Sequence, residues 1–160
     1  NISMAEAAYQ VNWTYLSVAI ISPLGGYWAS QSESPKIPIL TLQLTGTVAF
    51  IALLSATITQ PLMIKVLLFI IGLSAGTQPI AFGLIDFVAP SSVLATAVSF
   101  CNVCVIAGAF ALQPIITTLL SLLPENSILS YQIAFMPIVI IMGFGMIAGL
   151  RVHTLRPHHE

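Results

Sequence analysis

The chain has 160 residues, of which 58% are hydrophobic and only 6% are charged, with a formal net charge of −1. A soluble domain carries about 25% charged residues, so a soluble globule of this size would need far more charge to cover its surface. The mean hydropathy of +1.01 excludes that class of protein, and the near-zero net charge provides no basic surface for nucleic acid. We therefore expect the lipid bilayer to surround most of the protein.

Five stretches of the chain are long and apolar enough to cross a hydrocarbon core about 30 Å thick. In chain order they cover residues 11–30, 37–59, 62–88, 92–123 and 131–150. They are continuously apolar rather than alternating, which is typical of helices and not of barrel strands. The breaks between them are short and carry turn residues, so consecutive stretches must run antiparallel. The predicted fold is an all-α, polytopic transmembrane helix bundle.

Basic residues indicate the orientation of this bundle. Lys36 follows the first stretch, Arg151 and Arg156 follow the fifth, and five crossings bring all three to one side, against Lys65 on the other. Because loops rich in Lys and Arg remain in the cytoplasm, we expect an extracytoplasmic segment over 1–10 and a cytoplasmic tail over 151–160. An outside start without a signal peptide and an odd number of spans are typical of a piece of a longer protein.

No catalytic set is visible, and we expect neither an enzyme nor a cofactor. The two cysteines, Cys101 and Cys104, have C-x-x-C spacing but lie in an apolar run with no second pair to complete a metal site. We predict that they are buried small residues. The three histidines all lie in the polar tail after the fifth stretch, where a solvated tail is the simpler interpretation than a metal site.

Four prolines, Pro23, Pro79, Pro114 and Pro137, lie inside the first, third, fourth and fifth stretches. A proline inside a helix removes one backbone hydrogen bond and kinks the helix. In a membrane such kinks are tolerated where a neighbouring helix or a water-filled cavity satisfies the freed carbonyl. We predict kinked helices around a cavity; a plain bundle with kinks is the alternative.

Small residues recur at four-residue spacing within the stretches. The pairs are Gly72 with Gly76, Ala107 with Ala111, and Gly145 with Gly149. Small residues with this spacing let two helix backbones approach closely, so we assign these pairs to helix packing and not to chemistry.

Uncharged polar residues form a stripe on the fourth stretch. Asn102 and Gln113 are eleven residues apart, about three helical turns, so they share one face. Ser99 on the same stretch and Gln78 at the kink of the third are further candidates to line a cavity. An amide in lipid is unfavourable without a partner or water. Two interpretations stay open: a polar wall that contacts solute, or hydrogen bonds between helices.

Asp86 is the only acidic residue within a predicted span, near its cytoplasmic end. Lys36 emerges on the same side of the membrane in this topology. We predict that Asp86 and Lys36 form, or lie near, a charge contact that holds one transporter state closed.

Two neighbouring segments carry a family resemblance. The run ATAVSFCN at 95–102 followed by GAFALQP at 108–114 resembles helix eleven of bacterial members of the major facilitator superfamily. Those members have a G-T-A-x-G-F-x-N start that leads to a G-A-x-x-Q-P kink. The run QPIAFGLIDFVAP at 78–90 is similar to the end of helix ten and its short cytoplasmic turn.

A further run of residues matches the family less completely. The run GGYWAS at 25–30, followed by Lys36, falls where the family repeats its G-x-x-x-D-(R/K)-x-G-(R/K)-(R/K) signature between helices eight and nine. Ser30 stands where the family has Asp, and Lys36 is the only basic residue of that loop.

The resemblance implies that the five spans are helices eight to twelve of a transporter that consists of two six-helix halves. It implies the C-terminal part of a secondary transporter in a bacterial inner membrane, which moves a small solute, with or without a coupling proton or ion. Two six-helix halves rock around a central site in such proteins, so the partner of this chain would be the missing N-terminal half. A non-transporting membrane scaffold or assembly subunit is the alternative.

Overall fold

The computed structural model describes residues 3–55, 58–124 and 127–151, which form helices and connecting turns without any strand. Its elements are α1 (Met4–Gln31), α2 (Lys36–Leu54), α3 (Pro61–Leu73), the 3₁₀ turn η1 (Ser74–Gly76), α4 (Thr77–Val88), α5 (Leu94–Leu122) and α6 (Ile128–Leu150). The predicted cytoplasmic tail, with Arg156 and the three histidines, lies outside the described residues after Arg151.

Local sequence signals explain where several helices begin. Ser3 is the N-cap of α1, and its side-chain oxygen accepts a hydrogen bond from the backbone N–H of Glu6 at 3.1 Å, as capping serines do. Pro61 occupies the first turn of α3, where its missing N–H leaves no intrahelical bond unmade. α2 ends at Leu54, five residues before the predicted end of the second span.

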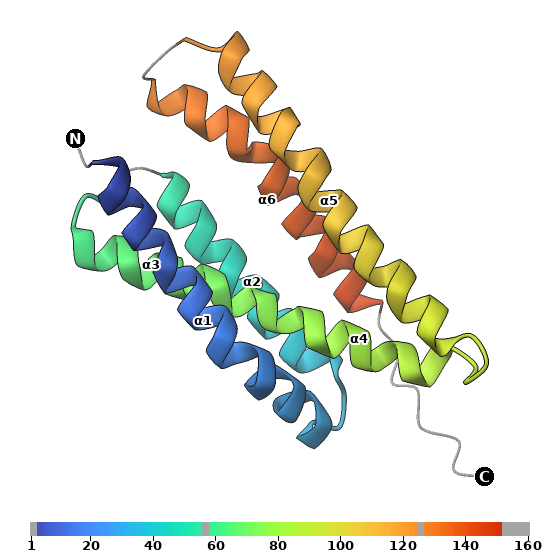
Figure 1. Cartoon of the computed structure of the whole chain (residues 1–160). Coiled ribbons are helices and arrows are strands. Elements are labelled where there is room, and N and C mark those ends of the chain that lie inside the picture. The colour runs from blue at the N-terminus through green and yellow to red at the C-terminus, as the bar shows by residue number, and fades with distance from the viewer. Residues whose placement is uncertain (1–2, 56–57, 125–126, 152–160) are drawn as a thin grey trace.

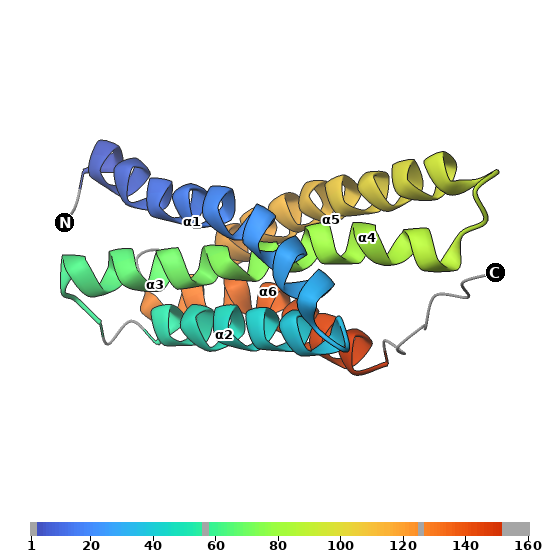
Figure 2. The ribbon, with the colours of Figure 1, turned by 90° about the horizontal axis from the view of Figure 1, so that it is seen from below.

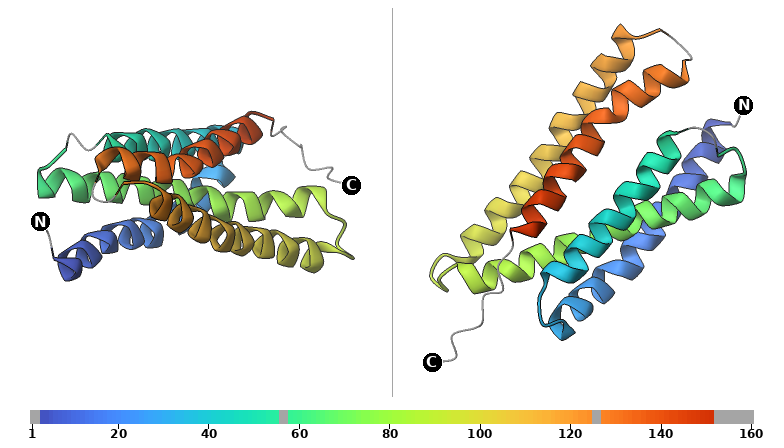
Figure 3. Two further views of the ribbon diagram at one scale, coloured as in Figure 1. Left: turned by 90° about the horizontal axis from the view of Figure 1, so that it is seen from above. Right: turned by 180° about the vertical axis from the view of Figure 1, so that it is seen from behind.

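Five long helical segments run antiparallel through the molecule, because α3, η1 and α4 follow one another as a single segment (Figure 1). We call this run of residues 61–88 the third segment. Seen from below and from above, it lies between a layer that contains α1 and α5 and a layer that contains α2 and α6 (Figures 2 and 3).

Four of these segments are long and apolar enough to cross a membrane: α2, residues 61–86 of the third segment, α5 and α6. Large apolar side chains lie on their outer surfaces, as at Leu122, which is 76% exposed. The chain is therefore an integral membrane protein, and the predicted all-α bundle of apolar helices is confirmed. α1 has 28 residues and so exceeds the length of a span, but it is more polar than the other four.

The third segment is interrupted at its centre. The 3₁₀ turn Ser74–Gly76 separates α3 from α4, and Pro79 follows three residues later. Pro79 has no backbone N–H to donate to the carbonyl of Ala75, so the regular α-helical ladder cannot continue through this point. Pro23, Pro114 and Pro137 lie inside helices that continue past them, and whether they kink these helices stays a prediction.

The densest packing lies where α1 and α2 meet the third segment. Ile39 and Leu42 of α2 and Ile80 of α4 form a buried cluster, with Ile21 of α1 and Leu73 of α3 packed against it. α2 also contacts α6 on its other side, and α5 contacts only α6 and α4 among the described helices. The molecule therefore has a well-packed part and a thinly covered one.

The exposed face of α5 as a candidate functional site

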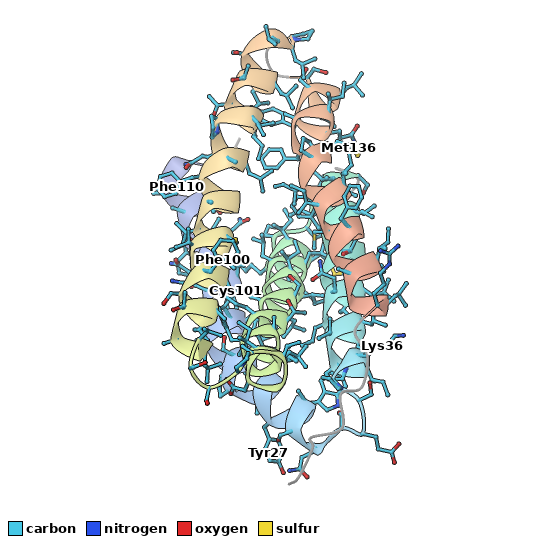
Figure 4. All side chains as sticks on the ribbon, turned by 90° about the vertical axis from the view of Figure 1, so that its right-hand side faces the viewer. Tyr27, Lys36, Phe100, Cys101, Phe110 and Met136 are labelled. Atoms are coloured by element: carbon cyan, nitrogen blue, oxygen red, sulfur yellow. The ribbon has the colours of Figure 1, made fainter. Side chains whose placement is uncertain are left out.

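α5 is the least covered of the long helices. None of its 29 residues is buried, although it has the length and hydropathy of a membrane span. Its half-buried residues include Cys101, Leu112, Ile116 and Leu119, which share one side of the helix and mark the side that packs on its neighbours. Phe110 is 74% exposed and lies on the side of α5 away from α6 (Figure 4).

The predicted cavity residues of α5 lie outside this packed side. Asn102 and Gln113 are exposed, and each follows a half-buried residue, Cys101 or Leu112, so each is turned about 100° around the helix from the packed side. Ser99 is also exposed. The structure thus brings these three side chains onto one uncovered flank of α5, which we call the polar flank: Ser99, Asn102 and Gln113.

Within the described residues, neither side-chain amide of the polar flank has a hydrogen-bond partner. Two hydroxyl groups on α5 are satisfied inside their own helix: the Thr117 hydroxyl donates to the Gln113 carbonyl at 2.9 Å, and the Ser121 hydroxyl donates to the Thr118 carbonyl at 2.8 Å. Because an unpaired amide in hydrocarbon costs several kcal/mol, the polar flank needs water, solute or another protein segment beside it.

Gln78 is placed apart from the polar flank. It is the second residue of α4, immediately before Pro79, and its side chain is exposed. α4 contacts α5, but no hydrogen bond joins Gln78 to Ser99, Asn102 or Gln113 within the described part of the chain. Gln78 therefore stays a separate candidate for the same role.

Two other glutamines have side-chain amides that form hydrogen bonds between helices. The Gln132 side chain of α6 donates to the carbonyl of Leu54, the last residue of α2, at 2.9 Å. The Gln43 side chain of α2 donates to the carbonyl of Met142 in α6 at 3.4 Å. Both join α2 to α6, next to a tilted ring contact between Phe50 and Phe135 at 6.5 Å. The sequence does not predict these two structural amides, because a polar stripe is recognised within one helix and Gln43 and Gln132 lie on different helices.

The predicted charge contact is not formed in this structure. Lys36 begins α2 and lies at the same end of the bundle as Tyr27 (Figure 4), where α4, the helix that carries Asp86, also ends (Figure 1). No ion pair within 4.0 Å joins Asp86 and Lys36, both of which are described. A contact between them in another state of a transporter stays a prediction.

Neither cysteine is buried, so that prediction was wrong. Cys101 is half-buried and Cys104 exposed, and both are free thiols. The reason is that α5 packs on little of its circumference. In the described residues no three His, Cys, Asp or Glu side chains gather where they could hold a metal ion.

Comparisons with known protein families, with characterised proteins and with solved structures found no match to this chain. The functional interpretation of the polar flank therefore depends on its geometry alone.

Proposed function

We propose that this chain is the C-terminal part of a secondary active membrane transporter, which moves a small solute by alternating access between two halves. The polar flank of α5 would form part of the wall of the solute pathway, and the missing N-terminal half would face it. The protein would lie in a bacterial inner membrane with its C-terminus in the cytoplasm, and a proton or another ion would drive the solute if transport is coupled.

One observation carries this proposal. α5 has the length and hydropathy of a membrane span but no buried residue, and two of its exposed side chains are amides without a hydrogen-bond partner among the described residues. Intramembrane polar groups normally face a bundle interior or a water-filled cavity. These polar groups occupy one flank of an uncovered surface that is otherwise apolar, and a helix that lines a cavity presents polar groups in this way.

A membrane scaffold or assembly subunit is the second candidate. The same uncovered side of α5 would then bind a helix of another protein, and Asn102 and Gln113 would donate hydrogen bonds across that interface. Such bonds are worth about 0.6 kcal/mol each on average in membranes. The two candidates differ in what the amides contact: water and solute in a transporter, side chains and backbone in a scaffold.

A transport screen on the complete protein, in cells or proteoliposomes, tests the proposal. Once a transported solute has been found, Asn102→Ala and Gln113→Ala should each reduce uptake by about tenfold or more, because a site that bonds a polar group discriminates strongly against its loss. Gln132→Ala is the matched control, since this amide bonds to Leu54 and should leave uptake per folded protein unchanged. Uptake insensitive to both α5 variants would remove the polar flank from the pathway.

A further inference from the structure

α1 differs from the other long helices in how it can enter a membrane. It has 28 residues, more than a span needs, and a single charged residue, Glu6, in its first turn. It is nevertheless more polar than the four segments that are apolar enough to cross a membrane. Polar residues lower the free-energy gain of helix insertion, which Leu, Ile, Phe and Val supply in only a few tenths of a kcal/mol each. Hydropathy alone therefore does not account for α1 as a span.

The polar side chains at the centre of α1 fall into two groups. The Ser22 hydroxyl donates to the Val18 carbonyl at 2.7 Å, a bond inside α1 that forms in any surroundings. Thr14 and Ser17 face the third segment instead. The Thr14 hydroxyl donates to the carbonyl of Leu68 in α3 at 3.1 Å. Ser17 is fully buried against Gly72, and its hydroxyl has no hydrogen-bond partner within the described residues.

The backbones of α1 and the third segment also fit closely. A Cβ atom added at Gly72 would lie 2.5 Å from the carbonyl oxygen of Thr14, and one added at Gly25 would lie 2.9 Å from the carbonyl oxygen of Gly76. Only glycine permits such an approach, which brings many atom pairs into dispersion contact. The two glycine contacts lie eleven residues apart along α1 (Thr14 to Gly25), about three turns, so the fit extends along the middle of the helix.

From these observations we infer that α1 is a conditional span: it crosses the membrane because the third segment offers it a fitted face, and not through its own hydropathy. Among the described helices α1 contacts only α2 and the third segment. The third segment follows α1 in the chain, so α1 would settle across the membrane only after residues 61–88 have entered it. This inference does not depend on the proposed transport function.

The test measures on which side of the membrane each end of α1 lies. In the full chain with both native cysteines changed to Ala, single cysteines are placed at Ala5 and Ser91, which are exposed positions near the start of α1 and between α4 and α5. A membrane-impermeant maleimide is applied to sealed vesicles of either orientation. With the native glycines, the two positions should label from opposite sides.

Gly72→Leu should change this pattern, because its side chain occupies the space of the Thr14 backbone. We expect the ratio of same-side to opposite-side labelling at Ala5 to rise at least about tenfold, the ratio that 1.4 kcal/mol produces, while Ser91 keeps its side. Gly83→Leu is the matched control on the same segment, since nothing lies within 4 Å of a Cβ at Gly83. It should leave both labels unchanged.

A rescue separates conditional insertion from general misfolding. Asn12→Leu, Thr14→Val and Ser17→Ala together make α1 more apolar and should restore opposite-side labelling in the Gly72→Leu chain. Opposite-side labelling that survives Gly72→Leu without rescue would overturn the inference, because α1 would then cross unaided. So would failure of the rescue, a change of side at Ser91, or loss of the chain from the membrane in both backgrounds.

Discussion

α1 and α5 lie in the same layer of the bundle (Figure 2), yet they meet their surroundings in opposite ways. α1 is the more polar helix, and the third segment covers the polar groups at its centre. Thr14 donates a hydrogen bond to Leu68, and Ser17 is buried without a hydrogen-bond partner among the described residues. α5 is strongly apolar, but it leaves Asn102 and Gln113 uncovered. Polarity in a membrane helix therefore does not by itself indicate a functional face. What matters is whether another part of the protein already covers the polar group.

The same comparison holds for glycine. Gly72 in the third segment has the backbone of α1 against it, whereas nothing lies within 4 Å of a Cβ at Gly108 on α5. We expect Gly72→Ala to lower the free energy of unfolding by about 1–3 kcal/mol, as overpacking does. Gly108→Ala should stabilise the helix by up to about 1 kcal/mol.

Titration with a denaturing detergent, followed by circular dichroism, measures both changes in micelles. Equal effects of the two glycine variants would show that α1 and α5 are covered alike, and the contrast between them would fail.

A paired and an unpaired glutamine extend the comparison to side-chain amides. Gln132 bonds to α2 and Gln113 bonds to nothing described. Gln132→Leu should destabilise the protein by about 0.6–1.7 kcal/mol, the range measured for hydrogen bonds between membrane helices, with solute uptake by folded protein intact. Gln113→Leu should leave the unfolding free energy unchanged or raised and abolish uptake. The reverse pattern would assign Gln113 a structural partner.

Two threonines give a smaller effect of the same kind. The Thr14 hydroxyl donates to another helix, through Leu68, and the Thr117 hydroxyl donates within α5 to Gln113. Thr14→Val should reduce stability by about 0.6 kcal/mol, and Thr117→Val by less, because its loss separates no pair of helices. A larger loss from Thr117→Val would mean that α5 has an unrecognised neighbour there.

The smallest change in stability is expected at Asp86. Its side chain is exposed and makes no ion pair with Lys36, so Asp86→Asn should alter the unfolding free energy by less than about 0.5 kcal/mol. If a charge contact with Lys36 closes another state, this substitution should still change the transport rate of the complete protein. An unchanged rate would remove that role.

The helices and their order could be predicted because apolar runs of span length separated by turn residues leave few alternatives. The interruption near Pro79 has a local cause, the missing N–H. The Gly72–Gly76 spacing predicted packing, which the contacts with α1 confirm. The partner of those glycines could not be read from the sequence, since nothing local sets the register between distant helices.

The sequence also could not predict that other helices cover so little of α5. In a soluble helix, apolar periodicity separates the covered side from the exposed one. In a membrane helix, lipid and protein interior are equally apolar, so α5 shows the same run of apolar residues on its packed and its open sides. For that reason the apolar run around Cys101 and Cys104 wrongly predicts that both are buried, and Gln43 and Gln132 have the same chemistry as Gln113. Only the packing tells them apart.

The accessibility of the polar flank to water tests the central claim most directly. In the complete protein without native cysteines, Asn102→Cys, Gln113→Cys and Ala111→Cys are each exposed to a membrane-impermeant thiol reagent, which reacts with the thiolate in water. Cysteines at 102 and 113 should be modified, and added solute should protect them. A cysteine at 111, an exposed position about half a turn around α5 from Asn102 and Gln113, should stay unmodified in lipid. Modification at 111 with none at 102 and 113 would contradict the assignment of the polar flank to the solute pathway.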